Sequence, residues 1–89
     1  MKIAQFVDEF VQGHKGIIGC YIAVMPNDGK YDLEIEISEG SIGSTFATGS
    51  SSLSHARDVA DAIDVALGNA GIQVFQERHA WELFLSARP

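Results

Sequence analysis

The segment TGSSSLSHARD, Thr48 to Asp58, is the first place where residue types and spacing suggest chemistry. A glycine-rich turn that enters a helix offers free backbone N–H groups and the positive end of the helix dipole, which together bind phosphate. The segment lacks the Gly-Lys-Ser/Thr of a P-loop and the glycine spacing of a dinucleotide site. Arg57 is its only Lys or Arg, and acids follow it. We therefore interpret the segment as a turn capped by Ser52 or Ser54.

Carboxylates are the more informative feature of the chain. Eight of the twelve acids lie between residues 28 and 64, and only Lys30 and Arg57 oppose them, so this span carries the whole formal net charge of -6. Its acids are Asp28, Asp32, Glu34, Glu36, Glu39, Asp58, Asp61 and Asp64.

Three of these acids alternate with apolar residues in YDLEIEIS, which is the pattern of a half-buried strand. Asp32, Glu34 and Glu36 then share one face at intervals of ~6.8 Å. A row of this kind can take the place of a row of nucleic-acid phosphates. The simpler interpretation is a solvated strand face whose charges protect the sheet from edge pairing.

Catalytic patterns are absent from the sequence. His14, His55 and His79 are widely separated and lack the spacing of metal ligands. Ser52 and Ser54 lie close to His55 in sequence, but this proximity does not make a nucleophile–base pair. We expect no enzymatic activity, no cofactor and no metal.

The elements that position these residues follow from periodicity and turn signals. Residues 2–13 have helical apolar spacing, and residues 54–70 form a second helix with Ala56, Val59, Ala60, Ile63 and Leu67 on one face. Pro26-Asn27-Asp28-Gly29 predicts a hairpin between the flanking strands, and residues 41–48 a third strand. A strand begins again at Ile72. We interpret residues 81–86, WELFLS, as a further strand, with a short helix as the alternative.

The expected fold is α+β, in a single domain spanning residues 1–89. It contains an antiparallel sheet of three to five strands with two helices packed on one face, in the order α-β-β-β-α-β(-β). The lone Cys20 lies in an apolar run, so we expect a buried thiol in a reducing cytoplasm. We expect no signal peptide, because Asp8 and Glu9 stand where its apolar core would lie, and no apolar run is long enough to cross a bilayer.

The order helix, three strands, helix, together with YDLEIEI and TGSSSLSHARDVADAIDVAL, resembles the double-stranded RNA-binding domain over residues 2–70. That family carries a basic, phosphate-gripping cluster at the start of its second helix. The matching positions here are Ser54, His55, Ala56 and Arg57, so the lysines are missing. The resemblance therefore implies shape, whereas RNA binding would require a positive face.

In size, acidity and α+β build the chain is also similar to small phage-encoded inhibitors of the anti-CRISPR type. This resemblance implies a DNA decoy that binds a basic protein, such as a CRISPR effector subunit, without contacting nucleic acid or membrane itself. Alternatives are a HicB-like antitoxin and a degenerate RNA-binding-type domain used for dimerisation; monomer and dimer both stay open. A competing apolar interface would centre on Trp81 or Val65. The expected partner-binding residues are Asp32, Glu34, Glu36, Glu39, Asp58, Asp61, Asp64 and Val65.

The charge balance predicts that the chain does not bind duplex DNA or RNA measurably at physiological salt, because it has too few cations to release many counterions. A gel-shift titration tests this. Submicromolar binding to duplex RNA would instead support the RNA-binding-domain resemblance and make residues 49–54 a phosphate site.

Overall fold

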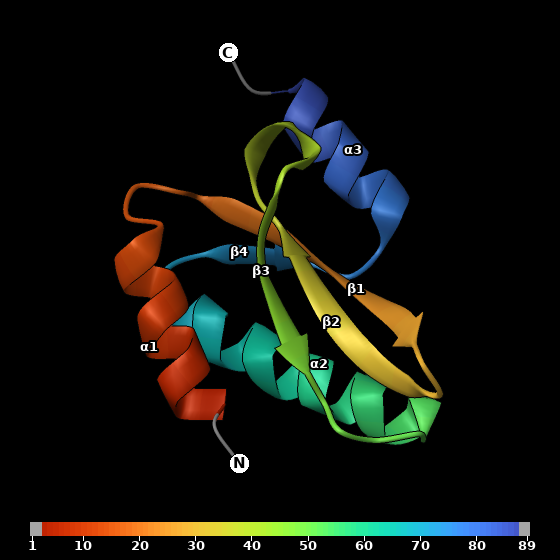
Figure 1. Cartoon of the computed structure of the whole chain (residues 1–89). Coiled ribbons are helices and arrows are strands. Elements are labelled where there is room, and N and C mark those ends of the chain that lie inside the picture. The colour runs from red at the N-terminus through yellow and green to blue at the C-terminus, as the bar shows by residue number, and fades with distance from the viewer. Residues whose placement is uncertain (1–2, 88–89) are drawn as a thin grey trace.

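The fold is described by a computed structural model that covers residues 3–87, without the side chain of Glu39. Its elements follow one another along the chain as in Figure 1. They are α1 (Ile3–Gly13), β1 (Gly19–Asn27), β2 (Lys30–Glu36), the 3-10 turn η1 (Ser38–Gly40), β3 (Ile42–Ala47), α2 (Leu53–Asn69), β4 (Gln73–Phe75) and α3 (Arg78–Ser86). The α+β class and the order of elements up to β4 agree with the sequence analysis.

The strands form one sheet in the order β3-β2-β1-β4. The predicted hairpin is confirmed, since β1 and β2 pair antiparallel around Asp28 and Gly29. Both turn residues have positive φ, 54° and 81°, as a two-residue hairpin turn of the I′ kind requires.

The expectation of a wholly antiparallel sheet is wrong at β4, which pairs parallel to β1. Strand β2 pairs antiparallel with both β1 and β3, so β3 runs in the same direction as β1. Helix α2 then returns the chain over the sheet, so the next strand runs parallel to both. The sheet is therefore mixed.

The main core lies between α1, α2 and one face of the sheet, which we call the inner face. All five predicted positions of α2 are buried, and Cys20, Ile22, Leu33, Ile35 and Phe46 face them from the strands. Burial, and secondarily the charge of Asp64, raises the pKa of the Cys20 thiol to about 12. The predicted burial of Cys20 is thus confirmed.

Residues 78–86 form helix α3, so the strand interpretation of WELFLS is wrong and its helical alternative is confirmed. Glu77 caps this helix by accepting hydrogen bonds from the backbone N–H groups of His79 and Ala80, both at 3.0 Å. Trp81, Phe84 and Leu85 repeat at helical spacing and face the sheet. Helix α3 packs on the sheet face opposite α1 and α2, which we call the outer face (Figure 1).

Among the described residues, no helix combines the length and the apolar character needed to span a membrane.

Replacing Ile63 by Ala should lower the free energy of unfolding by about 2–5 kcal/mol, because Ile63 is fully buried and the change leaves a cavity. Val65→Ala is the matched control, since Val65 lies on the same helix and is 65% exposed. We expect the control to change stability by about 0.5 kcal/mol or less. Urea titration measures both, and equal losses would contradict this assignment of the α2 faces.

Candidate protein-binding face

The β2 acids lie together in the middle of the outer face. Leu33 and Ile35 point into the core, so by strand alternation Asp32, Glu34 and Glu36 point the other way. Asp32 and Glu34 are half-buried, and the Glu36 side chain is only 12% exposed.

Uncharged side chains border this carboxylate row on both sides. Across β1, the partners of Asp32, Glu34 and Glu36 are Met25, Ala23 and Tyr21. Across β3, the partners are Ala47, Thr45 and Ile42. Within the described strands, no cation lies opposite any of the three acids, so cross-strand pairs do not neutralise their charges.

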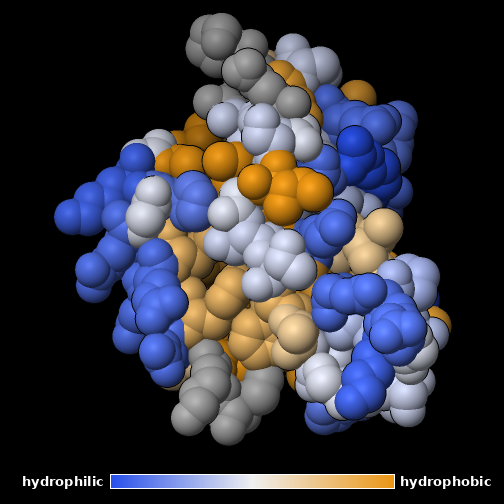
Figure 2. Space-filling view, viewed as in Figure 1, coloured by the Kyte–Doolittle hydropathy of each residue, from blue (hydrophilic) through white to orange (hydrophobic). Residues whose placement is uncertain are grey.

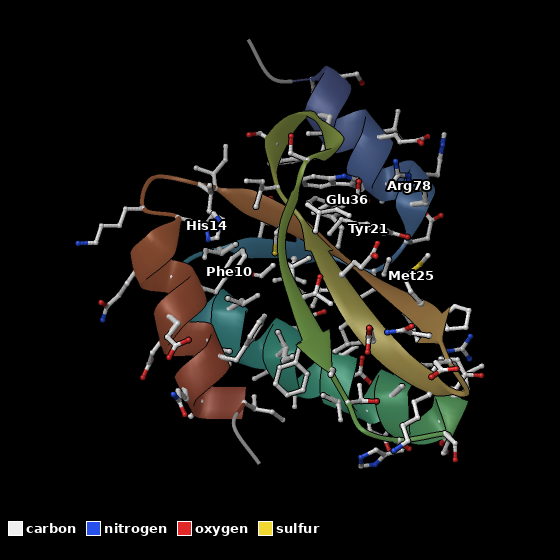
Figure 3. The ribbon with its side chains drawn as sticks, in the orientation of Figure 1. Phe10, His14, Tyr21, Met25, Glu36 and Arg78 are labelled. Carbon is white, nitrogen blue, oxygen red and sulfur yellow. The ribbon has the colours of Figure 1, made fainter. Side chains whose placement is uncertain are left out.

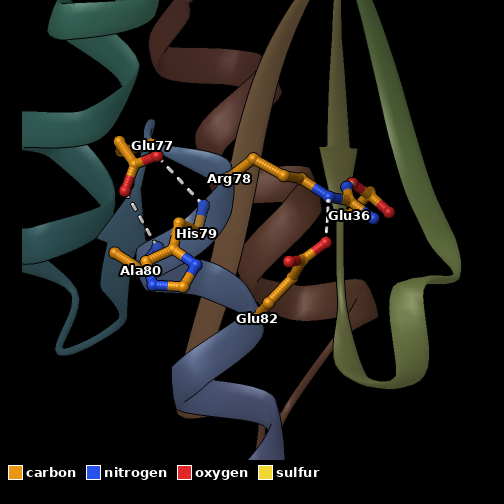
Figure 4. A network of polar contacts seen from close by, with 6 residues as sticks. All are labelled: Glu36, Glu77, Arg78, His79, Ala80 and Glu82. Atoms are coloured by element: carbon orange, nitrogen blue, oxygen red, sulfur yellow. Dashed lines mark hydrogen bonds and ion pairs between the residues drawn. The ribbon is translucent and has the colours of Figure 1, made fainter.

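Only one of the three carboxylates has a charged partner among the described residues. Glu36 forms an ion pair with Arg78 of α3, and Arg78 also bonds Glu82 one helical turn further on, at 3.2 Å (Figure 4). The hydrogen bond that Arg78 donates to Glu82, together with the charge of Glu36, raises the pKa of the Arg78 guanidinium. Asp32 accepts a bond from the Asn27 side chain at 2.8 Å, and Glu34 has no described hydrogen bond.

Helix α3 covers one end of the outer face through an aromatic cluster. Trp81 is fully buried, and its ring lies 6.3 Å from that of Tyr21 and 5.6 Å from that of Phe84. Arg78 lies over the Tyr21 ring, with its guanidinium carbon 5.3 Å from the ring centroid. Figure 3 shows Tyr21, Glu36 and Arg78 gathered near α3. The sequence hypothesis of a Trp81-centred interface does not fit this burial.

The outer face beyond this cluster is open and carries exposed apolar side chains. Met25 is 40% exposed and Ile42 is 56% exposed, and both flank the carboxylate row. In Figure 2, hydrophobic surface runs down the middle of this view, deepest in colour in the upper half near the connection between β2 and β3, with hydrophilic groups at its sides.

The acids of α2 lie on a different surface. Helix α2 covers the inner face, and its exposed side carries Asp58, Asp61 and Val65, with Asp64 at the margin. Asp61 and Asp64 both accept hydrogen bonds from the Gln76 side chain, at 2.9 and 2.8 Å. The structure thus joins these two acids to each other but separates them from the β2 row. The side chain of Glu39 lies outside the described residues.

The Gly-Ser turn before α2 uses its own hydroxyl groups to satisfy its backbone. Ser50 N–H donates to Thr48, Ser52 N–H donates to Ser50, and His55 N–H donates to Ser52. Ser52, one of the two serines predicted for this role, is the N-cap of α2. These three amides already have acceptors, so the geometry agrees with a capped turn.

Four further residues belong to these surfaces without having been predicted from the sequence: Gln76, Arg78, Met25 and Ile42. The i,i+4 pair of Arg78 and Glu82 and the acid at position 77 were the available signals for a helix, but the run WELFLS was interpreted as a strand. Met25 and Ile42 become neighbours of the carboxylates only through strand register.

No protein-family model, curated protein or solved structure matches this chain. Among the described side chains, no group of three or more His, Cys, Asp or Glu could hold a metal ion. Function is therefore inferred from the shape and charge of the two surfaces.

The Glu77 cap should make the stability of α3 depend on pH. Bonds from the His79 and Ala80 N–H groups lower the pKa of Glu77. Its stabilising contribution is therefore complete above the ordinary glutamate pKa and is lost as the pH falls through the lower native pKa. Glu77→Gln should lower the urea midpoint of unfolding near pH 7, and this difference from wild type should vanish in acid. Trp81 fluorescence measures the unfolding transition at each pH.

Asp8→Asn removes an exposed carboxylate from α1 and serves as the control, with no expected change in midpoint at any pH. A Glu77→Gln defect that persists undiminished in acid would show that the carboxylate charge is not what stabilises the cap.

Proposed function

We propose that this chain is an acidic protein-binding module whose outer face binds a basic, nucleic-acid-binding protein and competes with its nucleic acid. The observation that carries the proposal is the row Asp32, Glu34 and Glu36 on the outer face of the sheet, bordered within the sheet on both sides by uncharged residues. This reading extends the resemblance to phage-encoded inhibitors, in which the partner would be a nucleic-acid-binding effector.

The carboxylate row has an electrostatic cost for the folded protein. Three like charges on one strand face repel one another, and a neutral polar residue would keep the same face solvated. Glu34 has no described partner, and the chain as a whole carries a net charge of -6. A partner with lysines and arginines spaced to contact phosphates would relieve this repulsion and gain speed of association.

Apolar contact at the flanks supports the same assignment. Interfaces combine a desolvated apolar centre with polar groups around it. Met25 and Ile42 supply exposed apolar surface on both sides of the carboxylate row.

The α2 acids have a different role in this proposal. Asp58, Asp61 and Asp64 lie on the other side of the sheet from the β2 row, so one flat partner surface cannot cover both sets. They strengthen the negative field that attracts a basic partner from a distance.

The test begins with capture of the partner from a host lysate and its identification by mass spectrometry. Affinity is then measured for wild type and for Asp32→Ser/Glu34→Gln/Glu36→Gln at two salt concentrations. We expect the triple variant to bind at least ~10-fold more weakly, with a slower on-rate and a flatter salt dependence. Its melting temperature should fall only by the contribution of the lost Glu36–Arg78 ion pair, because Asp32 and Glu34 are half-buried, have no described charged partner and contribute little to stability.

The control variant is Val65→Asp, which changes the exposed side of α2. Unchanged affinity of the triple variant, with no salt dependence, would contradict the proposal. A loss confined to Val65→Asp would transfer the interface to α2. Capture of a toxin would support the antitoxin alternative, and self-association alone would support the dimerisation domain.

A further inference from the structure

Strand β1 has an unpaired edge along much of its length. On that side β4 pairs only with Gly19, Cys20 and Tyr21. From Ile22 to Asn27, β1 continues beyond β4 toward the hairpin, with no described strand beside it (Figure 1). A free strand edge is a ready template for another extended chain.

The register identifies which backbone groups of β1 point to this edge. On β2, Tyr31 donates its N–H to the Ser50 carbonyl at 3.0 Å and accepts from the Thr48 N–H at 3.1 Å, so its polar groups point away from β1. Pro26 is the cross-strand partner of Tyr31, so its backbone groups must point away from β2. This position suits proline, which has no N–H to donate to β2.

The direction of the backbone N–H and C=O groups alternates from residue to residue along a strand. The backbone groups of Val24 and Ile22 therefore point to the free edge, as those of Pro26 do. Ile22 lies next to the end of β4. Val24 lies beyond it and presents both an N–H and a carbonyl to the free edge, and no hydrogen bond from a described backbone group outside the strands reaches it.

A cleft of about 340 Å³ occupies the place where the next strand would lie. Its floor is the β1 backbone, and α2 and the β4–α3 connection form its walls. The lining residues are Tyr21, Ile22, Ala23, Val24, Arg57, Asp61 and Gln76.

The α2 wall favours a cationic occupant. Asp61 and Asp64 share the single side-chain amide of Gln76, which neutralises neither charge. The ion pairs among the described residues are those of Arg78, and they include neither acid. Arg57 lies at the same cleft, so the wall is negative near Gln76 and positive near Arg57.

A second copy of this chain is a poor occupant. Antiparallel pairing of two β1 edges would place two α2 helices side by side on the same face of the joined sheet. Their exposed rows of Asp58, Asp61 and Asp64 would then approach each other as like charges.

We propose that the free edge of β1 binds an extended, lysine- or arginine-containing segment of a partner protein, which adds a strand beside Val24 and places a cation at Asp61 and Asp64. Backbone hydrogen bonds to β1 provide the affinity, and the two carboxylates select the charge. This site lies apart from the carboxylate row of the outer face and does not depend on the function proposed for that face.

The test uses a fluorescent, end-capped peptide of alternating lysine and valine, seven residues long, with a glutamate–valine peptide of equal length as its charge control. Anisotropy measures affinity, and hydrogen exchange of the Val24 amide locates the site. We expect the cationic peptide to bind and to protect Val24, and the acidic peptide to do neither.

Two versions of the cationic peptide, N-methylated at the valines or at the lysines, test strand pairing. Each version has its donors blocked along one edge only, so one version should lose binding and the other should keep it.

Variants of the protein test the charge selection. Asp61→Asn/Asp64→Asn should weaken binding about tenfold, because it removes the carboxylate that lines the cleft and the neighbouring carboxylate that shares its Gln76 partner. Asp8→Asn/Glu9→Gln on α1 makes the same change in net charge and should leave affinity within about twofold. Circular dichroism verifies that each variant is folded.

Several results would overturn the proposal. These are absence of cationic peptide binding at millimolar concentration, equal binding by both N-methylated versions, and equal losses in the two double variants. Val24 protection that rises with protein concentration without peptide would assign the edge to a second copy. Weakening by the outer-face triple variant, but not by Asp61→Asn/Asp64→Asn, would place the peptide on the carboxylate row instead.

Discussion

The register of the β1–β2 hairpin is the constraint on which the rest of this structure depends. Asp28 and Gly29 close the turn with positive φ at both positions, so Asn27 pairs with Lys30 and every later pair follows. Side chains alternate along a strand, so a slip of one residue would send Leu33 and Ile35 to solvent and bury the acids between them. Burying an unpaired carboxylate costs far more than a two-residue turn can supply, and the two faces of the sheet are therefore strongly specified.

The inner face then determines the course of the second half of the chain. Helix α2 must cover Ile22, Leu33, Ile35 and Phe46, and this path carries the chain from the β3 edge to the β1 edge. The strand that follows is short, because the chain leaves the sheet after Phe75 to form α3 on the other face. A β4 of three residues cannot pair with the whole of β1, which has nine. The open edge and its cleft are consequences of this difference in length.

The path of the chain after β4 also divides the outer face into a part covered by α3 and an open part. Helix α3 buries Trp81 against Tyr21 and Phe75, and Arg78 reaches from it to Glu36. The aromatic cluster gives this small domain a second apolar layer, while the β2–β3 half of the face stays open. The protein therefore presents two surfaces of like charge in different directions, the carboxylate row on the sheet and the Asp61–Asp64 pair at its edge. We propose that each of these two surfaces binds a basic partner.

The sequence by itself determined the local elements and their faces. The Pro-Asn-Asp-Gly turn, the alternation around Asp32 and Glu34, and the apolar stripe of α2 each predicted a feature that the structure contains, because turn chemistry and periodicity depend on near neighbours. The WELFLS run was ambiguous, since an aromatic, apolar segment of six residues satisfies strand and helix patterns alike. Only the tertiary structure decided that α3 closes the outer face, that β4 is parallel, and that Asp61 and Asp64 meet Gln76 beside an open strand. Those relations join residues far apart in the sequence. They depend on which surfaces stay uncovered once the core is packed, and a local sequence pattern does not show this.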